Sequence, residues 1–244
     1  MKNVDVLAIF AHPDDADLSV GGTLLKMKSF GYSTGILDIT RGEMGTRGTP
    51  ERRAIEAAEA AAILQVSHRI NLKLPDGHVF ADDESRIALV RVLRQVKPRV
   101  IFTHQFGDPH PDHNHITKLV REAARLSSMK KFDGEFGLDR IAIPRVAHSV
   151  FSRRVVPSFI VDISEFLETK TSAIRAHQSQ FYDPTSIEPE TRLTNKRFVD
   201  ELENRSRYFG SLIGVEAGEP FFVQEALNVE NPFELLTRPM NLYS

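Results

Sequence analysis

The sequence predicts an α/β fold: a doubly wound, mostly parallel sheet with helices on both faces. Strand-like and helix-like segments alternate five or six times from the N-terminus to about residue 127, as in parallel strands joined by helical crossovers. The 244 residues, 41% of them hydrophobic, are also enough for one large domain with a full core. We therefore expect residues 1–244 to form a single domain.

The segments of the first half follow from apolar runs and capping signals. Residues 4–10 are apolar except for Asp5, as expected for a buried parallel strand. Thr49 followed by Pro50 is a typical helix start, with Thr as the N-cap and Pro in the first helical position. On similar grounds we expect helices at 18–30, 50–64, 84–96 and 112–127, and strands at 35–39, 69–74 and 99–103.

The second half of the chain is less regular. Residues 148–151 and 159–163 have the composition of strands, and residues 164–180 and 192–208 have that of helices. From Glu219 onward no period is visible, so no element is predicted there.

The composition excludes several classes of protein and of site. A net charge of −2 argues against non-specific nucleic-acid binding, which needs a strongly basic surface. Because the chain has no Cys, any metal must be held by His, Asp or Glu. No apolar stretch approaches the roughly 18 residues of a membrane helix, and the N-terminus lacks the features of a signal peptide. We expect a cytoplasmic protein without nucleic-acid or membrane partners.

The first segment with catalytic potential is the loop Ala11-His12-Pro13-Asp14-Asp15, directly after the first expected strand. Ligands of open α/β sheets bind beyond the carboxyl ends of the strands. A catalytic zinc takes three protein ligands and leaves one position for water, and His12 and Asp15 can supply two of the three. Asp14, beside a ligand, can act as a general base that accepts a proton from water.

A second polar loop follows the strand at 99–103 and contains His110-Pro111-Asp112-His113. His113 can supply the third metal ligand. His110 can stabilise an oxyanion or donate a proton to a leaving amine, and Asp112 can hydrogen-bond His110 and fix its tautomer. Because both loops follow strands of one sheet, we expect them to meet at one site.

These residues also have ordinary structural interpretations. A single His near a strand end is more often a surface or hydrogen-bonded residue than a ligand. We favour that interpretation for His68, His78, His148 and His177. Asp14 and Asp15 can be an acidic pair at a helix N-terminus. A Pro-Asp pair beside His in both loops, each at a strand end, favours the metal site.

At these residues the sequence resembles the PIG-L, or LmbE-like, family of zinc N-acetylglucosaminyl deacetylases. The family's first motif, His-Pro-Asp-Asp preceded by Ala, is unchanged at 11–15, and its second motif, His-Pro-Asp-His, is present at 110–113. The likeness covers about residues 4–210. It implies a Rossmann-like fold, and it implies a homo-oligomer, which is common in the family.

The resemblance also implies a role for each motif residue. It implies that zinc, or another divalent metal such as Fe2+, is bound by His12, Asp15 and His113. Asp14 is then the general base. His110, oriented by Asp112, stabilises the transition state or protonates the amine. The implied partner is a small acetylated amino-sugar substrate.

A narrower likeness is to the branch that deacetylates N-acetylglucosaminyl-malate in bacillithiol biosynthesis. It rests on residues 40–46, 48–49 and Arg53, with further matches at 74–76, 162–164 and 179–181. It implies that Arg53 contacts a sugar hydroxyl or the malate, and that Asp76 accepts a hydrogen bond from a sugar hydroxyl. Without the resemblance, Arg53 is a solvated helix residue and Asp76 is a turn residue.

The sequence departs from the family's pattern at two positions. Many members carry Glu directly after the Asp pair, where this chain has Ala16 followed by Asp17. Close relatives often have Arg directly before the second motif, where this chain has Pro109. If that Arg binds a carboxylate, another cation must do so here. The candidates are Arg41, Arg47 and Arg53.

Two other functions are compatible with the expected fold. A metal-dependent phosphoesterase usually needs more carboxylates than these loops offer. A nucleotide-binding or regulatory module is permitted because a fold does not fix a function, but no G-x-G-x-x-G or Walker motif is present. We therefore expect a zinc-dependent deacetylase of an N-acetylglucosamine conjugate, with the malate conjugate favoured over inositol conjugates or chitobiose-like sugars.

Overall fold

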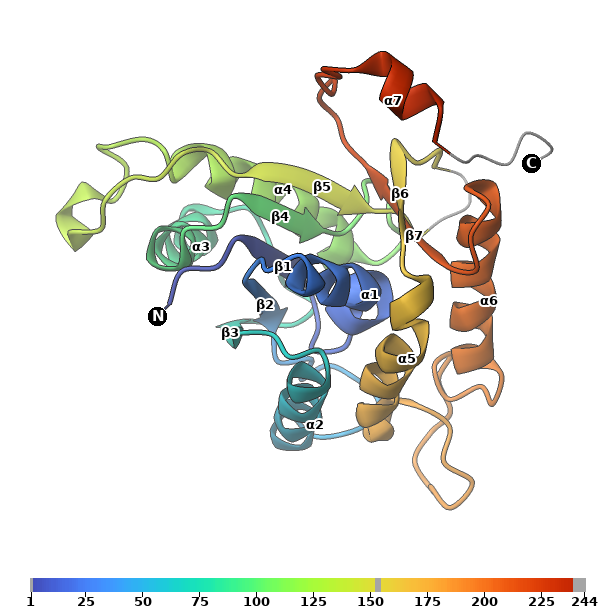
Figure 1. Ribbon diagram of the computed structural model, residues 1–244. Coiled ribbons are helices and arrows are strands. Elements are labelled where there is room, and N and C mark those ends of the chain that lie inside the picture. Colours follow the sequence, from blue (N-terminus) through green and yellow to red (C-terminus); the bar gives the residue numbers. More distant parts are fainter. Residues whose placement is uncertain (1, 152–154, 239–244) are drawn as a thin grey trace.

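The strands of the protein form one sheet. The computed structural model describes residues 2–151 and 155–238, and in these residues seven strands are ordered β3-β2-β1-β4-β5-β7-β6 (Figure 1). They are β1 (Val6–Phe10), β2 (Thr34–Thr40), β3 (His68–Leu74), β4 (Val100–Thr103), β5 (Arg145–Ser149), β6 (Phe159–Asp162) and β7 (Gly218–Phe222). The first five strands pair in parallel, whereas β7 is antiparallel to both β5 and β6. The expected mostly parallel sheet is confirmed.

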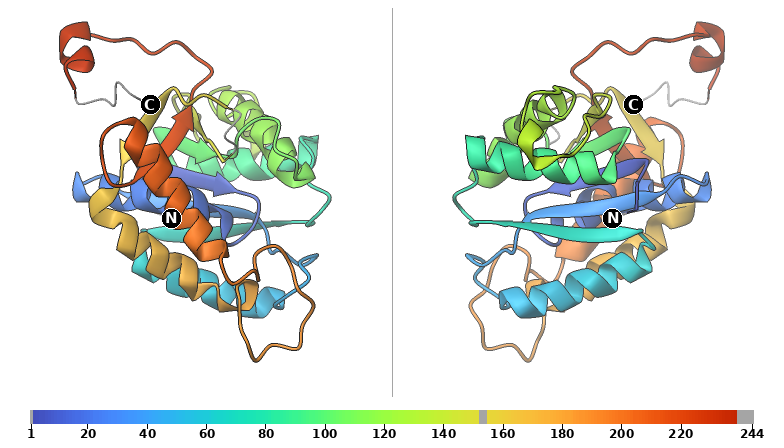
Figure 2. Two further views of the ribbon diagram at one scale, coloured as in Figure 1. Left: turned by 90° about the vertical axis from the view of Figure 1, so that its right-hand side faces the viewer. Right: turned by 90° about the vertical axis from the view of Figure 1, so that its left-hand side faces the viewer.

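Helices cover both faces of the sheet (Figure 2). One face carries α1 (Asp15–Ser29), α2 (Pro50–Ile63) and α5 (Leu167–Ala176), and the other carries α3 (Asp83–Val96) and α4 (Pro111–Leu126). Each layer of helices encloses its own hydrophobic core. Because successive strand residues point to opposite faces, Ile9 packs in the core under α3 and α4, and Phe10 packs in the core under α1.

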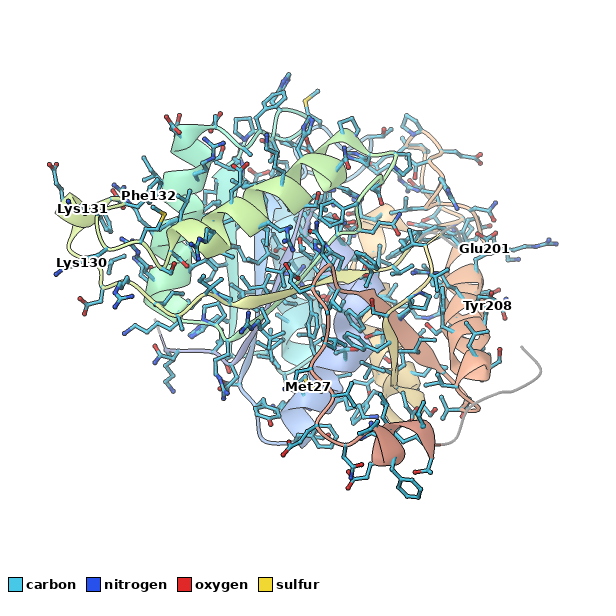
Figure 3. The ribbon with its side chains drawn as sticks, turned by 90° about the horizontal axis from the view of Figure 1, so that it is seen from above. Met27, Lys130, Lys131, Phe132, Glu201 and Tyr208 are labelled. Carbon is cyan, nitrogen blue, oxygen red and sulfur yellow. The ribbon has the colours of Figure 1, made fainter. Side chains whose placement is uncertain are left out.

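The remaining helices lie outside these two layers. α6 (Phe198–Leu212) packs against β7, buries Phe198, Leu202 and Phe209, and points Glu201 and Tyr208 outward (Figure 3). α7 (Pro232–Leu236) stands apart from the sheet in Figure 1. Short 3-10 turns occur at Gly134–Phe136, Ser164–Phe166 and Gln178–Gln180. No helix within 2–151 and 155–238 has the length and apolar character needed to cross a membrane.

The second half differs from the expected elements in two helices and in the segment after Gly218. The helix expected at 164–180 is broken into a 3-10 turn, α5 and a second 3-10 turn, and the helix expected at 192–208 begins only at Phe198. No element is expected from Glu219 onward, yet β7 lies there. Within this strand the carbonyl oxygen of Pro220 accepts the N–H of Val150 at 3.0 Å. Pro and Glu both disfavour strands, which explains why local sequence does not reveal β7.

A buried charge network supports the loop between β1 and α1. The Arg69 guanidinium, from β3, lies 2.8 Å from an oxygen of Asp38 and 3.0 Å from an oxygen of Asp17, and it donates to the carbonyl oxygen of Pro13. His177 Nε2 lies 3.1 Å from Asp17 Oδ2. Burial alone raises the pKa of Asp17, but the positive charges of Arg69 and His177 outweigh it and lower that pKa. Asp17, the acid that follows Ala16, is thus part of the scaffold.

Candidate metal centre and active site

The first loop brings His12 and Asp15 to the carboxyl end of β1. The backbone N–H of His12 donates to Asp15 Oδ2 at 2.9 Å, and His12 Nδ1 lies 3.1 Å from the same oxygen. The Thr40 N–H donates to the carbonyl oxygen of Ala11 at 2.9 Å, which holds the loop against β2. The helix that follows begins at Asp15, earlier than the expected start at residue 18.

The second loop places His113 opposite the first loop. His110 is the N-cap of α4 and Pro111 its first residue, so His113 lies in the first turn of the helix. His113 Nδ1 is 3.3 Å from Asp108 Oδ1, and His113 Nε2 is 3.3 Å from Asp15 Oδ2. The imidazole is therefore held between carboxylates that come from both loops.

His12, Asp15 and His113 lie close enough together to share one metal ion. One possible ligand atom of each lies within 4.8 Å of the other two, and His12 Nδ1 is 3.3 Å from His113 Nε2. Two imidazoles and a carboxylate suit zinc and several other divalent metals. In the described part of the chain, His12, His110 and Asp112 form a second trio. The first trio fits a metal better, because both carboxylate oxygens of Asp112 already accept backbone N–H groups.

The electrostatics of this cluster favour positive charge. Burial lowers the pKa of His12, but hydrogen bonds to Asp15 and Asp76 outweigh burial and raise the pKa to about 10. Burial also lowers the pKa of His113, but the charge of Asp15 and a hydrogen bond to Asp108 raise it to about 9. Imidazoles bind metals only when they are neutral, so a bound cation takes the place of these protons.

His104 is part of the site, although neither loop motif includes it. Its ring stacks on that of His113, with centroids 3.9 Å apart and planes 15° apart. Its Nε2 accepts the N–H of Ala11 at 2.9 Å. Burial and the positive charge of His113 lower the pKa of His104 to about 4. The available signal was its position directly after a strand, because β4 ends at Thr103.

Arg53 points from α2 into the site rather than into solvent. Its Nη2 lies 3.2 Å from Asp14 Oδ1, and its Nη1 donates to the carbonyl oxygen of Gly42 at 3.1 Å. Both side chains of the ion pair are buried. Gly42 has a φ of +68°, and a Cβ there would overlap Arg53 Nη1, so this close approach requires glycine. The structure therefore gives Arg53 a protein partner, the expected general base.

The loop after β3 brings Asp76 to His12. Asp76 Oδ1 lies 3.0 Å from His12 Nε2, and Asp76 Oδ2 accepts the N–H of Met44 at 2.9 Å. Burial raises the pKa of Asp76, but the hydrogen bond to His12 and the charge of His12 outweigh it and lower that pKa. Asp76 thus lies behind His12 and also lines the cavity, and its expected contact with a sugar hydroxyl stays a prediction.

Asp112, at the start of α4, also contacts the loop after β3. Its Oδ2 accepts the N–H of Gly77 at 2.7 Å, and its Oδ1 accepts the N–H of Val79 at 3.2 Å. Among the residues that the structure describes, no hydrogen bond joins Asp112 to His110. The His110 ring instead stacks on His113, with centroids 4.5 Å apart. Burial and the nearby charges of His113 and His12 lower the pKa of His110.

The residues of the site line a cavity of about 980 Å³. This volume lies in the range of ligand pockets and can hold an amino sugar together with an attached group. Segments outside the two loops also contribute to the wall. They supply Phe151, Val155, Arg192, Leu193 and Phe198.

Comparison with known proteins identifies the family. The PIG-L pattern, described as GlcNAc-PI de-N-acetylase, matches residues 7–124. A diacetylchitobiose deacetylase of Thermococcus kodakarensis is 33% identical over 189 residues, which cover 72% of this chain and 70% of that protein. The chain belongs to the PIG-L family. This PIG-L chain is therefore a deacetylase, and the expected family is confirmed.

Two further PIG-L comparisons extend over most of the chain. A probable N-acetyl-alpha-D-glucosaminyl L-malate deacetylase of Bacillus cereus is 28% identical over 188 residues, covering 72% of this chain and 83% of that protein. The crystal structure of the conserved protein TT1542 of Thermus thermophilus has a TM-score of 0.82 at 37% identity, covering 93% of this chain and 97% of that one. Both loop motifs lie within the matched residues 7–124, whereas the cavity wall at 151–198 lies beyond them.

Proposed function

We propose that this PIG-L enzyme hydrolyses the N-acetyl group of an N-acetylglucosamine conjugate, with zinc held by His12, Asp15 and His113. The observation that carries the proposal is the position of this trio beside the Asp14 carboxylate in one cavity. The names of the two similar deacetylases, which both refer to acetylated amino sugars, support it.

The chemistry follows from the residues around the trio. A divalent cation held there supplies a Lewis acid for the acetyl carbonyl and lowers the pKa of water. Asp14 takes a proton from water as the water oxygen bonds to the carbonyl carbon. The ion pair with Arg53, at 3.2 Å, holds the Asp14 carboxylate in place. When the carbon–nitrogen bond breaks, Asp14 gives the proton to the amine nitrogen, and acetate and the free amine leave.

His110 is placed to stabilise the carbonyl oxygen as it becomes negative. Its ring centroid lies 5.0 Å from that of His12, so it borders the same space. An N–H aimed at a developing oxyanion stabilises the transition state more than the substrate. Since both oxygens of Asp112 hold the 77–79 loop, we assign Asp112 to positioning this loop and His110 to donating the hydrogen bond.

Asp76 is proposed as the residue that orients His12. Replacing it with Asn is expected to weaken zinc binding roughly 10- to 100-fold, the usual cost of losing a carboxylate behind a ligating histidine. Asn keeps an oxygen for the Met44 N–H, so the loop is expected to stay in place. Competition with a chelator measures the zinc Kd. Asp83→Asn, on the exposed surface of α3, is the control, and an unchanged Kd in Asp76→Asn would rule the role out.

For the conjugate we propose N-acetylglucosaminyl-malate, which places the enzyme in bacillithiol biosynthesis. The similarity to the Bacillus cereus protein and the likeness at residues 40–46, 48–49 and Arg53 support this choice. Diacetylchitobiose is the second candidate, because the Thermococcus kodakarensis protein is 33% identical and because Phe106 and Phe151 offer aromatic surface to a second sugar. The homo-oligomer and the cytoplasmic location stay predictions.

The test is the release of free amine by the zinc-loaded enzyme. Three substrates are compared by kcat/KM: N-acetylglucosaminyl-malate, diacetylchitobiose and N-acetylglucosamine. A preference for the malate conjugate supports the first candidate, and a preference for diacetylchitobiose supports the second. Release from none of them would contradict the proposed substrate class and leave the metal site to be tested separately.

A further inference from the structure

Within the part of the chain that the structure describes, three arginines line the cavity, and two of them already have partners. Arg53 is held by Asp14 at 3.2 Å. Arg47 Nε lies 3.2 Å from Glu188 Oε2, and its Nη1 donates to the carbonyl oxygen of Phe181 at 3.4 Å. The exposed fractions of Arg47 and Arg53 are 5% and 4%. Their guanidinium groups are therefore committed to the protein.

Arg192 differs from both. Its side chain is exposed at the cavity and, among the described residues, has no hydrogen bond or ion pair. The turn that carries it is nevertheless fixed. The Thr191 N–H donates to Thr194 Oγ1 at 2.9 Å, and Leu193 packs against a buried cluster that includes Phe198. Arg192 is thus an unpaired cation at the cavity, on a turn whose backbone is held in place.

The carboxylates of the cavity do not compete for this cation, because each contacts another group. Asp14 pairs with Arg53 at 3.2 Å, and Asp108 lies 3.3 Å from His113. Asp15 and Asp76 both contact His12, at 3.1 Å and 3.0 Å. A guanidinium binds the oxygens of a carboxylate or phosphate through two parallel hydrogen bonds. A negatively charged group on a substrate therefore has a partner available outside the reaction centre.

We propose that Arg192 binds an oxyanion on the aglycone, the part of the conjugate beyond the amino sugar, and so selects anionic conjugates over neutral ones. The inference rests on the proposed deacetylation and adds the residue that sets its substrate class. The other candidate cations are less suitable. Arg47 and Arg53 are paired, and Arg41 lies outside the cavity lining, 3.8 Å from Glu43. Pro109, before the second motif, carries no charge.

The test compares the enzyme with Arg192→Gln on three substrates. These are N-acetylglucosaminyl-malate, an N-acetylglucosaminyl-phosphoinositol and the neutral methyl N-acetylglucosaminide. We expect Arg192→Gln to lower kcat/KM for an anionic conjugate about tenfold more than for the neutral one, mainly through KM, which corresponds to about 1.4 kcal/mol. The conjugate with the larger loss shows whether the recognised oxyanion is a carboxylate or a phosphodiester.

Two further variants separate charge from structure. Arg192→Lys keeps the charge without the planar fork and is expected to recover part of the selectivity. Arg197→Gln removes an exposed cation that precedes α6 and does not line the cavity, and it is expected to leave the ratio unchanged. An equal loss on all three substrates in Arg192→Gln, or no loss, would overturn the role of Arg192.

Failure of the proposed deacetylation can be told apart from failure of the role of Arg192. If the unsubstituted enzyme releases amine from none of the three conjugates, the proposed function fails, and Arg192 is then tested by calorimetric binding of glucosaminyl-malate and of a glucosaminyl-phosphoinositol. About tenfold weaker binding to Arg192→Gln supports recognition of the anion, a factor that corresponds to about 1.4 kcal/mol. Equal affinity, or binding to neither protein, overturns it.

Discussion

Asp14→Asn is expected to lower kcat roughly 10²- to 10⁴-fold, the usual contribution of a general base, while the zinc content of the protein stays the same. Asn keeps an oxygen for the Arg53 guanidinium, which lies 3.2 Å from Asp14 Oδ1, but it cannot accept a proton from water. Asp14 belongs to neither trio that can share a metal in the described structure. Steady-state amine release and atomic emission analysis of zinc measure the two effects.

The control for Asp14→Asn is a conservative variant of the neighbouring cation, Arg53. Arg53→Lys keeps a positive charge near Asp14 and is expected to lose less activity than Asp14→Asn, because the base itself remains. Turnover at the normal rate by Asp14→Asn would disprove the assignment of the base. Loss of zinc from this variant would instead place Asp14 among the metal ligands.

His113→Ala is expected to abolish zinc binding and, with it, all measurable activity. A catalytic zinc usually has three protein ligands, and this change leaves two of them, His12 and Asp15. Zinc per chain after dialysis measures the loss directly. A second readout is the Tm, because a ligand that binds only the folded state raises the stability by mass action. Zinc is expected to raise the Tm of the unsubstituted protein and to leave that of His113→Ala unchanged.

His78→Ala is the matched control for this variant. His78 lies in the loop held by Asp112, its side chain is exposed, and it belongs to neither metal trio of the described residues. This variant is expected to bind zinc normally. If His113→Ala retained zinc, the metal would have to be held by the other trio, and Asp112 would have to give up its backbone partners.

The first half of the fold was predictable because its signals are local. Thr49 accepts a hydrogen bond from the Arg52 N–H at 3.2 Å, and the helix runs from Pro50 to Ile63, as the N-cap and Pro signals indicate. The approach of the two motif loops was also predictable. Strands β1 and β4 are parallel neighbours, so the loops after them reach the same edge of the sheet.

The parts that were not predictable depend on contacts between distant segments. Glu219 belongs in a strand because its carboxylate accepts the N–H groups of Gly22 and Thr23 and lies 2.7 Å from Lys170 Nζ. None of these partners is near it in the sequence. The partners of Asp76 and Asp112 depend likewise on where the loop after β3 lies, and a motif such as His-Pro-Asp-His contains no information about that loop.

β3 is the outermost strand on one side of the sheet, and the loop after it contacts both His12 and the start of α4. Segments at the margin of a fold open locally at a lower free-energy cost than central ones. Local opening of β3 and its loop would separate Asp76 from His12 and so lower the affinity of the site for a cation. Conversely, a cation bound at the site would raise the free energy needed to open β3 locally. The stability of this edge of the sheet and the cation affinity of the site are therefore energetically linked.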